Sequence, residues 1–229
     1  MDTFVENLVA PLNAPQRRAV LHREGPLLVL AGPGSGKTRV ITHRAAHLVH
    51  CGVAPRNILA ITFTNKAAGE MRERLSRLGV SGQMWIHTFH ALGVRLLREF
   101  APLAKLQPGF TIYDDSDQKT VMKAALEIAG VRESFLKPES ALHKISDAKN
   151  KLVTPTEFQA NATFPDQITL GRVYDVYQQL LEQRNAVDFD DLLMKTALLL
   201  QHQDHITEEL NIRFKYLLID EYQDTNRAQ

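Results

Sequence analysis

The sequence has one cysteine, no long apolar run and almost no net charge. The single cysteine, Cys51, excludes a disulfide within the chain and is typical of a reducing compartment, so we expect a cytoplasmic protein. No apolar stretch approaches the roughly 20 residues of a membrane-spanning helix, and no signal peptide opens the chain. We therefore expect no membrane partner.

The net charge of +1 over 229 residues gives no overall sign of a nucleic-acid partner. Its distribution is less even, because residues 31–100 contain 10 Lys and Arg against 3 Asp and Glu, a net of +7. The rest of the chain contains 17 against 23, a net of −6. The basic segment fits a phosphate or nucleic-acid surface, and a solvated helix face explains it equally well.

The sequence does contain a glycine-rich loop. Residues 26–38 read PLLVLAGPGSGKT, and a helical pattern over 39–49 follows at once. The apolar run Leu27–Ala31 predicts a strand buried on both faces, as in a parallel sheet. Strand, loop and helix together are typical of a phosphate-binding P-loop, although the strict pattern has Gly where this chain has Ala31.

Each part of the loop would contribute to phosphate binding. Three glycines let the backbone wrap around an anion with its N–H groups pointing inward, and the helix adds the positive end of its dipole. Lys37 would reach the β- and γ-phosphates of a nucleotide, and the Thr38 hydroxyl would ligate Mg²⁺. Pro33 removes one N–H and stiffens the loop. The expected phosphate-binding residues are Ala31, Gly32, Pro33, Gly34, Ser35, Gly36, Lys37 and Thr38.

A second half of the site follows the apolar run Tyr216–Ile219, which predicts another buried strand. Asp220, at the carboxyl end of that strand, would hold Mg²⁺ through its water shell. Glu221 is placed to accept a proton from the water that attacks the γ-phosphate, and it is a further candidate for the metal site. The sequence therefore predicts Lys37 and Glu221 as catalytic residues, and Thr38, Asp220 and Glu221 around Mg²⁺.

The order of elements predicts an α/β fold. Apolar runs at 57–62 and 84–86, together with the one at 27–31, alternate with helical patterns and indicate a parallel sheet with helical crossovers. Residues 114–186 contain helical patterns and no convincing buried strand. We therefore predict an all-helical insertion at 114–186 within a parallel-sheet domain formed by 1–113 and 187–229.

Upstream of the loop, residues 12–20 predict a short helix with Asn13 as its N-cap and Pro15 in its first turn. Gln16 would be an ordinary exposed residue in most such helices. Beside a P-loop, its amide can also pair with N6 and N7 of adenine. Both interpretations of Gln16 stay open on this residue alone.

Six short motifs span the chain: LNAPQ at 12–16, AGPGSGKT at 31–38, ITFTNK at 61–66, TFH at 88–90, DFDDL at 188–192 and DEYQDTN at 220–226. Together they resemble the UvrD/PcrA/Rep group of superfamily 1 DNA helicases. The resemblance implies a RecA-like ATP-binding domain interrupted by a helical subdomain. It also implies ATP and Mg²⁺ as cofactors and 3′–5′ unwinding of DNA by the parent protein, in DNA repair or replication.

The resemblance further implies roles for single residues. Gln16 would read adenine, and Arg39 would stack its guanidinium on the adenine face. Two segments would contact single-stranded DNA through aromatic, hydroxyl and cationic groups. Phe63 in the core and Lys66 at a solvated helix start are the simpler alternatives. The expected DNA-binding residues are Phe63, Thr64, Asn65, Lys66, Thr88, Phe89 and His90.

By the same resemblance, the γ-phosphate-sensing glutamine and the second RecA-like domain of the family lie beyond Gln229. We therefore expect the chain to bind ATP, single-stranded DNA, a duplex junction and that second domain, with little or no ATPase or unwinding activity of its own. Two alternatives stay open. One is a non-catalytic nucleotide- or DNA-binding fragment, and the other is a P-loop NTPase of another class.

One further cluster could suggest a metal site. His43, His47 and His50 lie at i, i+4 and i+7 with Cys51 beside them, a spacing that could hold zinc. No second Cys/His pair accompanies them in the sequence. We therefore expect a solvated or partly packed helix face at these residues.

Overall fold

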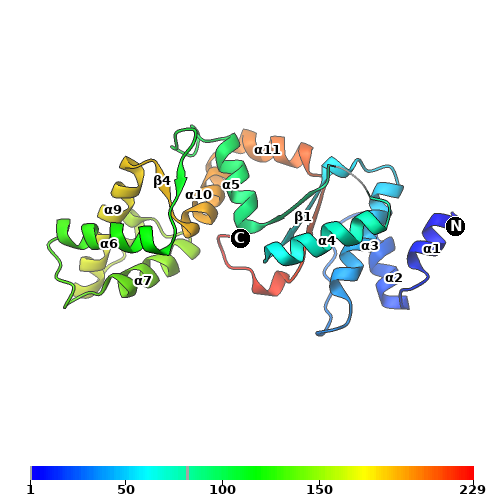
Figure 1. Ribbon diagram of the computed structural model, residues 1–229, viewed down its shortest axis with the longest axis horizontal. Helices are drawn as coiled ribbons and strands as arrows, with labels where there is room; N and C mark the ends of the chain where they lie inside the picture. Colours follow the sequence, from blue (N-terminus) through cyan, green and yellow to red (C-terminus); the bar gives the residue numbers. More distant parts are fainter. Residues whose placement is uncertain (1, 81–82) are drawn as a thin grey trace. The chain divides into compact units, whose positions relative to one another are not determined.

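The computed structural model describes residues 2–80 and 83–229, which fall into two compact units (Figure 1). The sheet unit comprises residues up to Phe89 together with His205–Asp224, and the helical unit comprises His90–Asp204 together with Thr225–Gln229. In the described part of the chain, no helix is both long and apolar enough to cross a membrane.

The sheet unit is built on three parallel strands in the order β2–β1–β5. They are β1 (Ile58–Thr62), β2 (Trp85–Thr88) and β5 (Tyr216–Ile219). Every residue of β1 is buried, as expected of the central strand of a parallel sheet. Because all three strands run the same way, the segments that follow them leave from one edge of the sheet. The strands expected near 57–62, 84–86 and 216–219 are confirmed.

Helices cover the sheet through a shared apolar core. Ala45 and Leu48 of α3 pack with Met71 and Leu75 of α4 against the fully buried Ile58 of β1. Helices α1 and α2 pack in turn on α3 (Figure 1). The helical segments of this unit are α1 (Thr3–Val9), α2 (Ala14–Leu21), α3 (Lys37–His50), η1 (Pro55–Asn57), α4 (Asn65–Arg77), α11 (Asp204–Arg213, of which Asp204 belongs to the helical unit) and η2 (Tyr222–Asp224).

The strand expected at Leu27–Ala31 is wrong: these residues run as irregular backbone. Leu28 is 67% exposed and Leu30 is 86% exposed. A strand is stable only when a neighbour supplies hydrogen bonds, and a cavity of about 870 Å³ lies between this segment and β5. Residues 27–31 have the apolar composition of a buried strand. Composition does not show whether a neighbouring strand is available to pair with them.

The exposure of this segment predicts unequal costs for two matched leucine truncations. Leu30→Ala should change the free energy of unfolding by about 0.5 kcal/mol or less, as expected of a surface site. Leu75→Ala removes a side chain that is 2% exposed in the core, and should cost about 2–5 kcal/mol. Urea unfolding of both variants measures the difference. Equal costs would mean that residues 27–31 are buried in a sheet.

Helices α6, α7 and α9 form the body of the helical unit (Figure 1). Their apolar core surrounds the fully buried Tyr174 and Tyr177. A two-stranded parallel pair, β3 (Thr111–Ile112) with β4 (Ala186–Val187), lies in the same unit. Its helices are α5 (Phe89–Glu99, of which Phe89 belongs to the sheet unit), α6 (Asp115–Ile128), α7 (Pro138–Asn150), α8 (Pro155–Ala160), α9 (Pro165–Gln183) and α10 (Phe189–His202).

This unit contains more of the chain than the expected insertion at 114–186, because it begins at His90 and extends to Asp204. Leu97 of α5 and Leu192 of α10 share a core cluster, and Gly93 lies so close to α10 that a Cβ there would meet the Leu192 carbonyl oxygen at 2.6 Å. Helices α5 and α10 therefore pack on each other and belong with α6–α9. Sequence periodicity marks the helices but does not show to which unit a helix is packed.

A buried ion-pair cluster joins α7 to the start of α10. Lys149 Nζ lies 2.7 Å from Asp188 Oδ2 and 2.9 Å from Asp191 Oδ1, and all three side chains are almost completely buried. The Tyr177 hydroxyl donates to Asp188, and the Gln178 amide donates to Asp191. Burial favours a neutral amine, but the two carboxylates outweigh it and raise the pKa of Lys149. The two carboxylates therefore favour the charged form of Lys149 in the interior.

Candidate nucleotide site

The conformation of the glycine-rich loop is fixed by hydrogen bonds within it. Gly34 and Gly36 have φ of 72° and 86°, in the left-handed region that favours glycine. The Ser35 hydroxyl donates to the Gly32 carbonyl oxygen at 2.6 Å. Helix α3 begins at Lys37, two residues earlier than the sequence pattern indicates. Its first N–H groups and positive dipole end therefore lie at the end of the loop, an arrangement suited to an anion.

Gln16 is tied to the same loop. Its Nε2 donates to the Ser35 carbonyl oxygen at 2.8 Å, while its Oε1 accepts from the Asn13 backbone N–H in a capping box at the start of α2. A Cβ at Gly36 would lie 3.0 Å from Gln16 Nε2. The amide expected to read adenine therefore fixes the loop in this structure, and the φ of 86° together with this close contact favours glycine at position 36.

The two halves of the expected metal site come together. The Thr38 hydroxyl, in the first turn of α3, donates to Asp220 Oδ2 at 3.0 Å. Asp220 follows β5 directly and is 4% exposed, with its backbone N–H bonded to the Ile61 carbonyl oxygen. Residues 182 positions apart in the chain thus meet at the edge where the parallel strands end.

This donor set fits Mg²⁺. Magnesium takes oxygen ligands and commonly uses one or two protein groups beside phosphate oxygens and water, which Thr38 and Asp220 can supply. Among residues 2–80 and 83–229, no three His, Cys, Asp or Glu side chains gather around a possible ion. An ion here would therefore depend on hydroxyl, phosphate and water oxygens in addition to Asp220.

Lys37 and Glu221 face each other across the site. Their charged atoms lie 3.7 Å apart, and Lys37 Nζ also donates to the Ala31 carbonyl oxygen at 3.4 Å. Glu221 has φ of 54°, a left-handed conformation that costs a non-glycine residue about 1–2 kcal/mol. The turn is held by Glu221 N–H donating to Asp220 Oδ1 and by the Gln223 amide donating to the Glu221 carboxylate.

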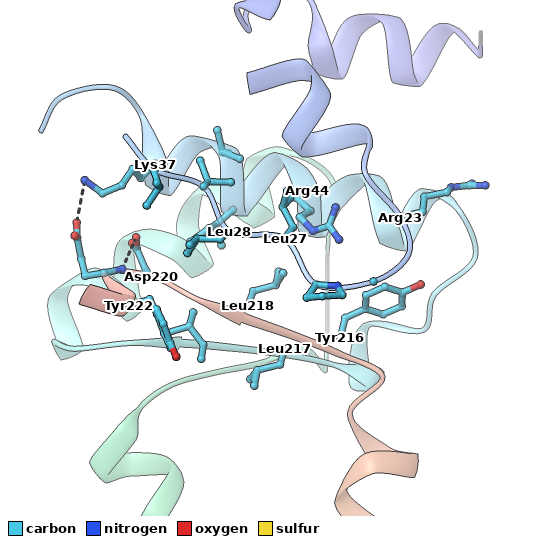
Figure 2. Close-up of a pocket in the computed structure, with 18 of the residues that line it drawn as sticks. Arg23, Leu27, Leu28, Lys37, Arg44, Tyr216, Leu217, Leu218, Asp220 and Tyr222 are labelled. Atoms are coloured by element: carbon cyan, nitrogen blue, oxygen red, sulfur yellow. Dashed lines mark hydrogen bonds and ion pairs between the residues drawn. The ribbon is translucent and has the colours of Figure 1, made fainter. Parts of the chain in front are cut away.

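Figure 2 shows the cavity that adjoins this site, with Lys37 and Asp220 at one end of it. Leu27 and Leu28 line one side, and Leu217 and Leu218 of β5 line the other (Figure 2). Within the described chain, β5 pairs only with β1. The apolar part of the cavity therefore lies along the unpaired edge of β5. The charged side chains Lys37 and Asp220 line only its polar end.

Arg39 lies on the other side of the loop's helix. It is exposed in the first turn of α3 and lines a second cavity of about 380 Å³ with His43, Arg74 and Arg77. Burial lowers the pKa of His43, so this histidine favours its neutral form. The guanidinium expected to stack on adenine is thus free to meet a flat, electron-rich ring.

The segments expected to contact DNA begin where β1 and β2 end. Thr64 caps α4 by accepting from the Ala67 N–H, and Asn65 and Lys66 are exposed at the helix start. Phe63 is half-buried and meets Phe89 edge to face, with ring centroids 5.4 Å apart. A single-strand surface here would use the exposed polar residues and part of the Phe63 ring.

The second segment is more enclosed than the first. Thr88 and Phe89 are each 7% exposed, so a ligand would reach them through backbone atoms. His90, in the helical unit, lies against Phe189 with ring centroids 6.1 Å apart. Burial lowers the pKa of His90, and the nearby Asp190 opposes that shift. His90 therefore favours the neutral imidazole, which both donates and accepts hydrogen bonds.

His47 and His50 of α3 have different partners and do not converge as zinc ligands would. His47 is buried, and its ring nitrogens lie 3.7 and 3.9 Å from Cys51 Sγ. His50 instead stacks on Phe4 and pairs with Asp2. These side chains have separate packing partners, in agreement with the expected helix face.

Comparison with known proteins agrees with this geometry. The profile of the UvrD/REP helicase N-terminal domain matches residues 12–229, which is nearly the whole chain. The chain belongs to the UvrD/REP helicase family. The expected resemblance is thereby confirmed, and so is the α/β class of the fold.

Two relatives of this UvrD/REP-type chain are both named ATP-dependent DNA helicase PcrA. The protein from Leuconostoc citreum is 46% identical over 98% of this chain, and the one from Staphylococcus aureus is 44% identical over 97%. In each case the match covers 31% of the relative. The chain therefore spans about a third of the length of these relatives.

Proposed function

We propose that the UvrD/REP-type chain is the part of an ATP-dependent 3′–5′ DNA helicase that binds ATP and single-stranded DNA. The observation that carries this proposal is the meeting of Thr38 with Asp220 at 3.0 Å beside Lys37 and Glu221. The side chains that would hold a nucleotide phosphate and Mg²⁺ thus lie together at one edge of the sheet. A P-loop NTPase of another class would share this edge, but it would have no use for the segments after β1 and β2.

Each residue of the site has a separate task in this proposal. The loop N–H groups and Lys37 bind the phosphates, and Thr38 and Asp220 hold Mg²⁺. The ion supplies positive charge against the phosphate oxygens. Glu221 takes the proton of the attacking water, since it is the carboxylate adjacent to Asp220. Arg39 would stack on adenine from α3, and Gln16 would read adenine from α2 by exchanging its bonds to Ser35 and Asn13 for bonds to the base.

The DNA-binding part of the proposal rests on Thr64, Asn65 and Lys66, which are exposed where β1 ends. Phe63 presents part of an aromatic ring beside them, the combination that single-stranded nucleic acids stack on and bind. The second segment, Thr88 to His90, would contribute backbone contacts. Because these segments and Asp220 follow parallel strands, DNA and nucleotide would be bound along the same sheet edge.

We further infer that unwinding requires parts of the helicase beyond this chain. The relatives named ATP-dependent DNA helicase PcrA are about three times longer than the matched region. A second RecA-like domain in the parent would close over the nucleotide and supply the remaining charge stabilisation. The chain alone would then bind its ligands and hydrolyse ATP slowly or not at all.

Binding of a fluorescent oligothymidylate tests the DNA part of the proposal. Affinity should fall steeply with salt, because each phosphate contact on a single strand contributes a slope of about −0.7 in log affinity against log salt. Lys66→Ala should reduce that slope by about one contact. Lys123→Ala, which removes an exposed lysine of α6, is the matched control and should leave it unchanged. A salt-independent affinity would refute a nucleic-acid surface here.

A further inference from the structure

The last residues of the chain belong with the helical unit. The chain passes from the sheet unit to the helical unit between Asp224 and Thr225. Two residues later, Asn226 Nδ2 donates to Asn150 Oδ1 at 2.6 Å. Asn226 Oδ1 accepts from the backbone N–H groups of Ala228 and Gln229. Both ends of this amide are therefore engaged, and Asn226 fixes the end of the acidic motif to α7.

Asn150 also contacts α10. Its Nδ2 donates to Asp190 Oδ1 at 3.0 Å and to the Ser146 carbonyl oxygen at 2.9 Å. The adjacent Lys149 is locked between two buried carboxylates at the start of the same helix α10. The end of α7 therefore cannot shift without moving the first turn of α10.

That first turn carries Phe189 and Asp190, which lie beside His90. The Phe189 ring packs on the His90 ring, and Asp190 is close enough to oppose the effect of burial on the histidine. His90 belongs to the second segment assigned to single-stranded DNA. A series of contacts thus runs from Asn226 through Asn150 to Asp190, and Phe189, the neighbour of Asp190 in the first turn of α10, contacts His90.

The chain that leads into this series begins at the Glu221 turn of the nucleotide site. Glu221, five residues before Asn226, pairs with Lys37 in a left-handed turn. A nucleotide phosphate would compete with Glu221 for the Lys37 ammonium, because both are anions that bind the same donor. Loss of this pair would leave the left-handed Glu221 turn held only by its bonds to Asp220 and Gln223, and a shift of that turn would move the segment that leads to Asn226.

We propose that Asn226, Asn150 and Asp190 are positioning residues that couple nucleotide binding to DNA binding. They touch neither ligand, and they transmit the state of the Glu221 turn to His90 through the helical unit. This inference rests on the proposed function, since it requires both ligands to bind. Because such coupling is reciprocal, each ligand changes the affinity of the other by the same factor.

The test is a pair of titrations of the 229-residue chain with a fluorescent ATP analogue, with and without saturating oligothymidylate. Allosteric coupling is typically about 5- to 150-fold, so we expect DNA to change nucleotide affinity at least fivefold. Asn150→Ala and Asn226→Ala should reduce the change to less than twofold, while each ligand alone binds within twofold of the wild-type affinity. Asn226 is exposed, so its variant does not endanger folding.

Three further variants separate coupling from a merely structural role. Asp190→Asn keeps an oxygen acceptor for Asn150 and should retain coupling, whereas Asp190→Ala should lose it. Asn161→Ala removes an exposed amide at the end of α8, outside the series, and should behave as wild type. The inference is overturned if both ligands bind without affecting each other. It is also overturned if Asn150→Ala, Asn226→Ala and Asp190→Ala keep the wild-type coupling. If either ligand fails to bind at all, the proposed function fails with it.

Discussion

Lys37→Ala should weaken binding of an ATP analogue by about 10- to 100-fold. A charge-assisted hydrogen bond contributes about 1.5–3 kcal/mol, and each 1.4 kcal/mol is a factor of ten in affinity. Lys37 is the cation that the loop directs toward Glu221, where a phosphate would also bind. Equilibrium titration with a fluorescent nucleotide measures the loss.

The control for this variant is Lys123→Ala, because that lysine is exposed on α6 and lies outside the site. It should bind nucleotide like the wild type. The unfolding curve of Lys37→Ala should also match the wild type, since the Lys37 ion pair is partly exposed and stabilises little. Unchanged nucleotide affinity in a folded Lys37→Ala protein would reject the phosphate-binding loop.

Lys149→Met should be the most destabilising single change that we predict. It leaves Asp188 and Asp191 buried without their cation, and breaking a buried ion pair in this way costs about 3–5 kcal/mol. The van der Waals volume is nearly kept, so the loss reports charge and hydrogen bonding more than packing. Urea or thermal unfolding, followed by circular dichroism, measures the free energy.

Lys144→Met makes the same chemical change on the same helix, at an exposed position. It should alter the free energy of unfolding by about 0.5 kcal/mol or less. A third protein, Lys149→Met combined with Asp188→Asn and Asp191→Asn, should recover part of the loss because no uncompensated charge remains. A cost below 1 kcal/mol for Lys149→Met alone would show that water reaches the cluster.

Local signals in the sequence were enough to predict most of the elements that position the site. Asn13 is the N-cap that the sequence predicts, and it forms a capping box with Gln16. Thr154 forms another with Glu157, at the Thr-x-x-Glu spacing typical of this motif. The strand before Asp220 also lies where its apolar run indicates. These features depend on neighbours within a few residues, so a single sequence contains the information. The pairing of Thr38 with Asp220 was expected from known P-loop chemistry, not from spacing.

Long-range packing could not be obtained in this way. The run Leu27–Ala31 has the composition of a buried strand, but a strand also needs a hydrogen-bonding neighbour, and β5 lies across a cavity. Lys149 could not be distinguished from other helix lysines, because its carboxylate partners are about 40 residues away. The dense acidic run at 188–191 was the available signal, since three carboxylates exceed what one helix cap needs.

We propose that Thr38, Asp220 and Lys37 form one site for a nucleotide with Mg²⁺, and this is the claim on which the other assignments depend. The most direct measurement is titration of the wild-type chain and of Asp220→Asn with a fluorescent ATP analogue, in Mg²⁺ and in EDTA. We predict that EDTA weakens binding to the wild type at least tenfold and changes binding to Asp220→Asn by less than twofold. Wild-type affinity that is the same with and without Mg²⁺ would contradict the claim.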